Sequence, residues 1–222
     1  MAITIENDTA LHEAAHCIIA YLANDLFEIK FVTADLALSK SQDASSLGGL
    51  RGSLRKKVGT LTFEDHDLMV LICLAGMAAD DINHSNNQLT EQLYDNTLFA
   101  RKMQSNKYSG DCQLFLPHLQ RIEPRLCISQ RQYTISCQRL LHEVFSNNMI
   151  TPILIGLRNE IENNPQKTLT GSEIIEYLDT TDLKNWRRNE WKQIYASRIC
   201  AIKKRDFKQR FCCWIKRFSN KP

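Results

Sequence analysis

His12 and His16 stand four residues apart, with Glu13 directly after the first of them, in an apolar run from Thr9 to Leu22. On a helix, side chains four positions apart share a face, with Cβ atoms about 5–6 Å apart. Two imidazoles at this separation converge on one Zn²⁺, at zinc–nitrogen distances of about 2.0–2.1 Å. A glutamate beside the first histidine can accept a proton from a zinc-bound water. The H-E-x-x-H spacing therefore predicts metal-assisted hydrolysis, usually of peptide bonds.

A helix over residues 9–23 is expected to carry this motif. Asn7, Asp8 and Thr9 are residue types that cap helix N-termini, and Asn24-Asp25 is a plausible stop. Only Glu13 and the two histidines are ionisable between Ala10 and Ala23, which predicts a helix buried nearly all round. The alternative is a chance pentapeptide on a core helix. Two buried histidines without a partner would be costly, which favours the ligand interpretation.

Composition indicates a globular chain with one sizeable core. Of the 222 residues, 43% are hydrophobic and 24% charged, which is ordinary for such proteins. The eight cysteines form no C-x-x-C pair, and the N-terminus lacks a basic region followed by an apolar segment. No apolar run approaches the ~20 residues that span a bilayer. A reducing, cytoplasmic location is the resulting expectation.

The charge is distributed unevenly along the chain. Of 28 basic and 25 acidic residues, 13 basic and 3 acidic ones lie from Thr181 onward, together with all three tryptophans. The tail is thus formally +10 and the rest −7. This break predicts a main domain over residues 1–180 and a basic tail over 181–222.

Hydrophobic periodicity predicts a mainly α fold with a small β-hairpin or sheet after the motif helix. Strands are expected at 27–38 and 58–63, with loops at 39–57 and 84–89 and a polar connection at 104–112. Helices after the motif helix are expected at 64–82, 90–103, 115–122, 129–147 and 150–163, and at 168–177, where Thr170 and Glu173 form a capping box.

Four segments resemble, in order, the peptidase domain of FtsH-type AAA+ membrane proteases. The run ALHEAAHCIIAYL resembles that family's zinc helix, with Ala15 in place of its usual Gly. LICLAGMAADDI at 71–82 is similar to its Leu-Gly-Gly-x-x-Ala-Glu-Glu helix, with Ala75, Asp80 and Asp81 as departures. VGTLTFED at 58–65 and TLTGSEIIEYL at 168–178 look like two further segments of the domain. The resemblance implies a helical zincin-type fold and a zinc metalloendopeptidase.

The resemblance also implies a third zinc ligand. In the family this is an aspartate about a dozen residues beyond the second Glu, at the start of a helix. Counting on from Asp81 reaches Asp95, followed by LFARKM. We therefore expect His12, His16 and Asp95 as ligands, with Glu91 as the alternative to Asp95. Asp95 as a solvated helix residue is a further alternative.

The expected reaction is Glu13-assisted attack of a zinc-bound water on a peptide bond of an unfolded protein or peptide. The strand at 58–63, with Gly59 and Thr60, is expected to bind substrate by β-addition. The family is ATP-dependent, but no G-x-x-x-x-G-K-[ST] motif occurs in these 222 residues. A separate ATPase or a homo-oligomer is therefore an expected partner. The alternative function is an inactive pseudopeptidase that serves as a binding or regulatory module.

The basic tail has three candidate roles. Its mixture of tryptophan, phenylalanine and basic residues suits an anionic membrane surface, and Cys212 and Cys213 are candidate palmitoylation sites. Docking on the acidic body is an equally favoured interpretation, and nucleic acid is the least favoured partner. A third, weaker function is a membrane or nucleic-acid binder driven by this tail.

Six further residues receive no catalytic role. Asp80 and Asp81 are expected on a helix surface, with support of the metal ligands as the less favoured alternative. The remaining histidines are expected on loops or helix surfaces: His66, His84, His118 and His142.

Overall fold

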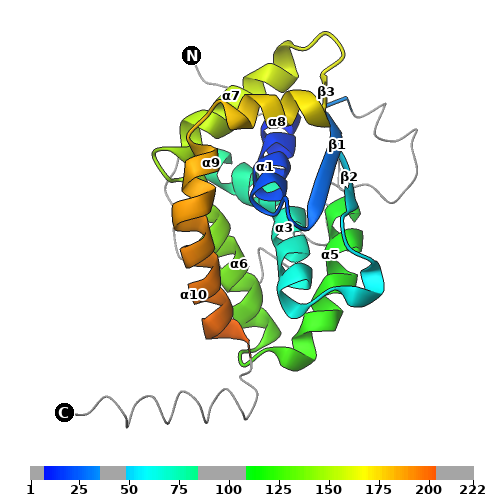
Figure 1. Ribbon diagram of the computed structural model, residues 1–222, viewed down its shortest axis with the longest axis vertical. Helices are drawn as coiled ribbons and strands as arrows, with labels where there is room; N and C mark the ends of the chain where they lie inside the picture. The colour runs from blue at the N-terminus through cyan, green and yellow to red at the C-terminus, as the bar shows by residue number, and fades with distance from the viewer. Residues whose placement is uncertain (1–7, 36–48, 85–108, 204–222) are drawn as a thin grey trace, which may run out of the picture.

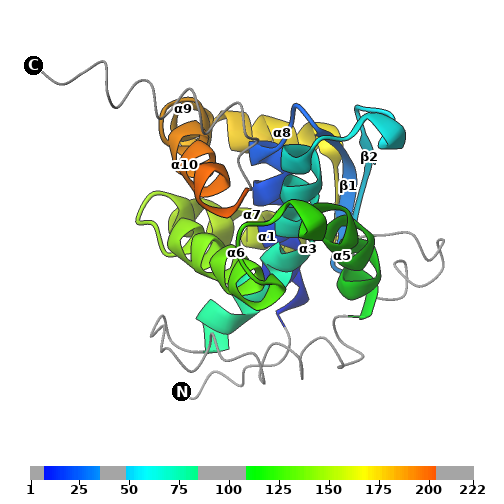
Figure 2. The ribbon, with the colours of Figure 1, turned by 90° about the horizontal axis from the view of Figure 1, so that it is seen from below.

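The computed structural model describes residues 8–35, 49–84 and 109–203. Within these residues the chain is mainly helical, with one three-stranded antiparallel sheet, so the predicted fold class is confirmed. The helix α1 (Thr9–Leu22) lies in the middle, with α3 (Phe63–His84), α7 (Ile150–Asn163) and the sheet around it (Figures 1 and 2).

The motif helix begins at Thr9, where the sequence predicts its start. Asp8, not Thr9, is the N-cap, and its side chain accepts a hydrogen bond from the Leu11 N–H at 2.9 Å. Twelve of its fourteen residues are buried, including His12, Glu13 and His16. A helix surrounded in this way places its motif inside the core.

Within the described residues the sheet has the strand order β2-β1-β3. There β2 (Leu50–Leu54) is an edge strand beside β1 (Phe27–Thr33), with β3 (Thr168–Thr170) on the other side. The register pairs Phe27 with Leu54 and Val32 with Leu50, with an irregularity between Ile29 and Phe31. A Cβ on Gly52 would overlap the Phe27 ring, so this glycine permits close strand packing. The loop predicted at 39–57 is therefore wrong over residues 50–54, where Gly52 is a strand residue.

The predicted strand at 58–63 is wrong. Residues Val58–Thr60 form a 3₁₀ turn, and Gly59 and Thr60 are exposed there. The following residues cap α3: the Thr62 hydroxyl accepts from the Asp65 N–H, and the Asp65 carboxylate accepts from the Thr62 N–H. This reciprocal capping removes the segment from any strand ladder.

The polar connection expected at 104–112 is also wrong at its end, because α5 (Ser109–Ile122) begins six residues before the predicted helix at 115. The helix packs on α3 through buried Cys112, Phe115, Leu119 and Ile122. These spacings of three and four residues give one apolar face. Asp111 is therefore in the first turn of a helix.

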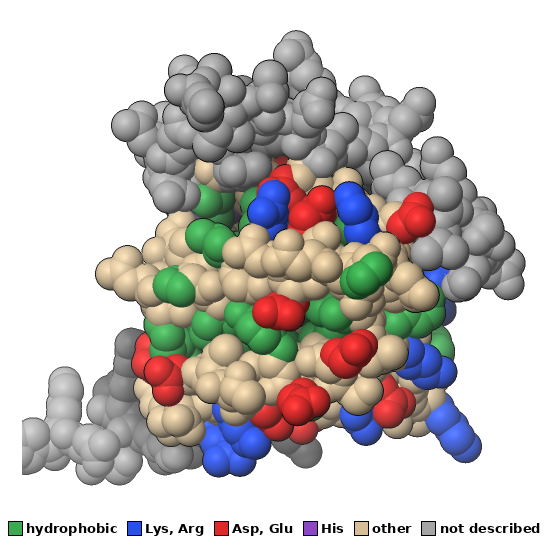
Figure 3. Space-filling model, turned by 90° about the horizontal axis from the view of Figure 1, so that it is seen from above, with side chains coloured by type: hydrophobic (Ala, Val, Ile, Leu, Met, Phe, Trp, Pro, Cys, Tyr) green, Lys and Arg blue, Asp and Glu red, His purple; other side chains and the backbone are tan. Residues whose placement is uncertain are grey.

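Three further helices follow the predicted pattern: α6 (Gln130–Phe145), α7 and α8 (Gly171–Asp179). A short 3₁₀ turn, η4 (Glu123–Arg125), joins α5 to α6. The predicted capping box of Thr170 and Glu173 is confirmed at the start of α8. The face that includes α7 and α8 shows a band of hydrophobic side chains with acidic and basic ones around it, and no histidine of the described residues is visible there (Figure 3).

The first half of the basic tail packs on the body. It comprises α9 (Leu183–Trp186), a π-helical turn η5 (Arg187–Trp191) and α10 (Lys192–Ile202). Trp186 and Trp191 are buried, and Arg198 forms a buried ion pair with Asp67 of α3 at 2.6 Å. Up to residue 203 the tail thus docks on its own chain.

The loop predicted at 84–89 is wrong at its first residue, because α3 extends to His84. Several expectations lie outside the described residues: the rest of that loop, the helix at 90–103 with Glu91 and Asp95, and Cys212 and Cys213. Membrane contact through the end of the tail stays a prediction. None of the helices in the described ranges combines the length and the apolar character that crossing a membrane requires.

Candidate metal centre

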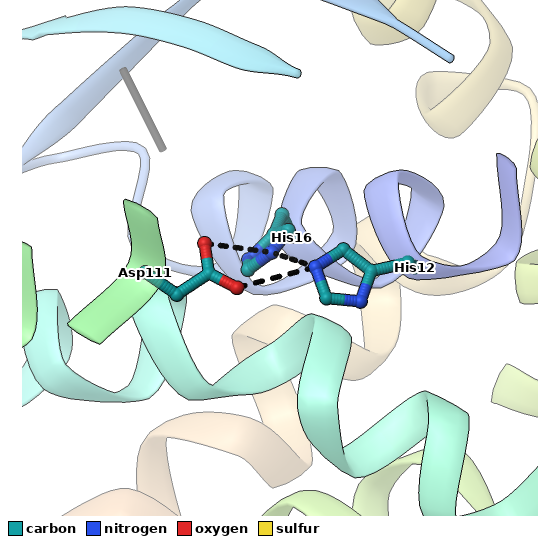
Figure 4. Close-up of side chains that lie close together, drawn as sticks. All are labelled: His12, His16 and Asp111. Atoms are coloured by element: carbon teal, nitrogen blue, oxygen red, sulfur yellow. Dashed lines mark hydrogen bonds and ion pairs between the residues drawn. The ribbon is translucent and has the colours of Figure 1, made fainter. Parts of the chain in front are cut away.

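Three side chains from two helices converge beneath the sheet. His12 and His16 come from α1, and Asp111 comes from the first turn of α5, with its carboxylate facing the ring nitrogens (Figure 4). All three are buried, at 8%, 0% and 3% exposure. This His-His-Asp group could hold a metal ion.

The spacing of the ligand atoms matches one shared ion. The Nε2 atoms of His12 and His16 are 3.1 Å apart, and Asp111 oxygens lie 3.2 Å from the first and 3.6 Å from the second. Ligands at about 2.0–2.1 Å from a tetrahedral ion are separated by about 3.3 Å. The three donors thus already stand at the separations that one ion would impose.

The other nitrogen of each ring is held by an acceptor on α3. His12 Nδ1 lies 3.1 Å from Asp80 Oδ2, and His16 Nδ1 donates to the Ile72 carbonyl at 2.6 Å. Donation from Nδ1 keeps the Nε2 lone pair directed at the shared point. Such outer partners fix the tautomer and orientation of metal-ligating histidines.

Glu13 lies beside this group without belonging to it. Its side chain is 3% exposed, and the Gly49 backbone N–H, just before β2, donates to its carboxylate. Burial raises the pKa of Glu13, and the charges of His16 and His12 offset this only in part. A carboxylate with a raised pKa next to a metal position is suited to accept and return a proton.

The buried charges favour a cation. Burial alone would raise the pKa of Asp111, but its contacts with His16 and His12 outweigh burial and lower it. Burial has the opposite effect on His12 and lowers its pKa, but the hydrogen bonds to Asp111 and Asp80 raise the pKa of His12 overall. Three acids, Glu13, Asp80 and Asp111, thus surround two imidazoles in the core. Protons on the imidazoles balance part of this carboxylate charge in the metal-free chain, and a divalent cation would replace them.

Two buried oxygens indicate where a ligand fits. Among the described residues, Asp111 Oδ1 and Glu13 Oε2 have no hydrogen-bond partner. Buried polar atoms are nearly always bonded, so an exception at a cluster of this composition points to an ion or water. The donor set and these two atoms both fit a metal with a water beside Glu13.

Gly76 permits the close approach of α3 to the motif helix. A Cβ at this position would overlap the His12 imidazole. In the segment that resembles the family's Leu-Gly-Gly helix, Ala75 replaces one glycine and Gly76 is the other. The packing against the first histidine thus requires glycine at position 76.

The expected surface position of Asp80 and Asp81 is wrong. They are 2% and 5% exposed, because α3 passes between α1 and α6 at this point. Asp80 contacts His12, and Asp81 Oδ2 lies 3.8 Å from His142 Nε2. His142, also expected on a surface, is fully buried on α6. Asp80 therefore has the supporting position that sequence reasoning ranked second.

The structure brings together His12, Glu13 and His16, and it adds Asp111, which sequence reasoning missed. Asp95 and Glu91 lie outside the described residues, so their roles as ligands stay predictions. A signal for Asp111 exists in the sequence: Ser109-Gly110-Asp111 precedes the apolar face of α5, which is where an acidic first-turn residue occurs.

Comparison with protein-family models finds no match for this chain, and comparison with curated proteins finds none either.

Proposed function

We propose that this chain is a zinc-dependent metalloendopeptidase similar to the peptidase domain of FtsH-type proteases. The observation that carries the proposal is the convergence of His12, His16 and Asp111, with the buried carboxylate of Glu13 beside them. Two imidazoles and one carboxylate form a ligand set typical of catalytic zinc, which keeps a fourth position open.

His12, His16 and Asp111 hold the ion in this proposal. Zinc, when bound, supplies the Lewis acidity that acidifies water and polarises a peptide carbonyl. Glu13 accepts the proton of the attacking water and passes it to the leaving amine. Asp80 and the Ile72 carbonyl keep the two imidazoles in the orientation that ligation needs.

An extended peptide is the substrate class that the surroundings favour. The edge strand β2 begins directly after Gly49, whose N–H donates to Glu13. A peptide added to this edge would run past the proposed catalytic carboxylate. This assignment replaces the predicted strand at 58–63, since Gly59 and Thr60 lie in an exposed turn.

The experiment compares wild type with Glu13→Gln on fluorescently labelled casein, after zinc loading. Loss of a general base typically lowers the rate about 10²- to 10⁴-fold. We expect the variant to retain zinc and lose cleavage to that extent, and a chelator to stop cleavage by wild type. Equal rates in the two proteins would contradict the mechanism. A wild type that binds zinc and cleaves neither casein nor short peptides would favour the inactive binding module.

A further inference from the structure

A second histidine pair lies on α3, which carries the groups that support the metal centre, and on α5, which carries the proposed ligand Asp111. His66 is in the first turn of α3, and His118 is seven residues beyond Asp111 on α5. At 1.5 Å per residue, this places His118 about 10 Å along the helix from the proposed ligand. The Nδ1 atoms of the two rings are 2.8 Å apart, and the ring centroids are 5.0 Å apart. The proposed peptidase mechanism does not use this pair.

Both imidazoles are in the form that binds metals. Burial lowers the pKa of His118 to about 4, and the neighbouring His66 adds to this effect. Burial and the charge of Arg121 lower the pKa of His66, with Arg125 acting in the same direction and Asp65 in the opposite one. At neutral pH each ring is therefore uncharged and has one nitrogen lone pair.

The geometry requires only a small adjustment. Tetrahedral zinc ligands stand about 3.3 Å apart, so the two Nδ1 atoms need to separate by about 0.5 Å. One proton must also move from Nδ1 to Nε2 of the ring that donates in the present contact, which changes no net charge. Both rings are partly exposed, so solvent can carry this proton and fill the remaining coordination positions.

We propose that His66 and His118 form a second, exchangeable site for a divalent cation that prefers imidazole, namely Cu²⁺, Ni²⁺ or Zn²⁺. Among the described residues no third acidic, histidine or cysteine side chain joins this pair within ligand distance. Arg121 and Arg125 also repel a cation. The second site is therefore weaker than the His12–His16–Asp111 centre, and a metal in it would clamp α5 to α3.

The test uses the full chain after zinc loading and titrates it with Cu²⁺ in calorimetry. The variants are His66→Gln and His118→Gln, and Gln120→Ala is an exposed control on the same helix. We expect an additional binding event in wild type and in the control, weakened at least about tenfold in each histidine variant because a chelating ligand is lost. The event in question is the one that both histidine variants weaken and the Gln120→Ala control does not. This definition does not depend on whether the first centre holds zinc.

Two results would overturn the proposal: no additional event in wild type, or an event of unchanged affinity in either histidine variant. Electron paramagnetic resonance of wild type at one Cu²⁺ per chain, with free Zn²⁺ kept in large excess so that the first centre stays filled, gives a check that does not depend on folding of the variants. Hyperfine coupling to two imidazole nitrogens is expected, and a spectrum without it would also overturn the proposal.

Discussion

Asp80 Oδ2 lies 3.1 Å from His12 Nδ1, and the two side chains come from different buried helices. The contact links α3 to the metal-binding face of α1 and fixes which nitrogen of His12 faces Asp111. His16 has the same arrangement with a backbone carbonyl in place of a carboxylate. Both imidazoles are thus oriented before any ion enters.

Replacement of Asp80 by Asn should weaken zinc binding about 10- to 100-fold, as is typical when an outer partner of a ligating histidine is changed. Asp81→Asn is the matched control, because this neighbouring acid is equally buried but contacts His142. Competition with a chromophoric chelator measures both affinities. Equal zinc affinities for the two variants would show that Asp80 does not orient His12.

Replacement of Arg198 by Met should destabilise the fold by about 3–5 kcal/mol, because the buried Asp67 carboxylate would lose its cationic partner. Arg198 Nη1 lies 2.6 Å from both Asp67 oxygens, and Tyr133 also donates to this carboxylate at 2.8 Å. Urea unfolding measures the change, with Lys192→Met as an exposed control on α10.

The double variant Asp67→Asn/Arg198→Met should recover part of that loss, because it removes the buried charge along with its partner. A loss below about 1 kcal/mol for Arg198→Met would mean that this ion pair does not anchor the tail.

The metal-free chain should lose stability as the pH falls from about 6.5 toward 4, in part through His118. Its pKa is about 4 in the folded state against an ordinary value of 6.5. The unfolded chain therefore takes up the proton first, and the free energy of unfolding falls through this window. Below pH 4 both states are protonated and this contribution changes no further.

Chemical unfolding at a series of pH values, with a chelator present, measures this effect. His118→Gln should show a shallower decline between pH 6.5 and 4 than wild type. Parallel curves would contradict the assignment of this slope to His118.

The sequence was sufficient for the features that depend on local patterns. The motif helix, the α3 helix and the capping box of Thr170 and Glu173 form where periodicity and capping residues predict them. Strand β2 was missed because glycine is typical of loops. The tertiary contact that requires Gly52, its packing against Phe27, is not visible in the sequence. The predicted strand at 58–63 does not form, because the side chains of Thr62 and Asp65 accept hydrogen bonds from each other's backbone N–H groups at the start of α3.

The site required tertiary structure for a different reason. H-E-x-x-H is a local spacing, so His12, Glu13 and His16 were identifiable from the chain alone. Asp111 is 95 residues from His16, and nothing in sequence periodicity specifies which distant acid a fold returns to a helix. The same holds for Asp80, whose burial depends on α3 lying between α1 and α6.

The proposed metal centre has Asp111 as its third ligand, beside His12 and His16. Zinc content by inductively coupled plasma mass spectrometry, in wild type, His16→Ala, Asp111→Ala and Asp95→Ala, tests it most directly. We predict about one zinc ion per chain in wild type and Asp95→Ala, and its loss in the other two variants. Zinc retained by Asp111→Ala and lost by Asp95→Ala, or no zinc in reconstituted wild type, would contradict the account.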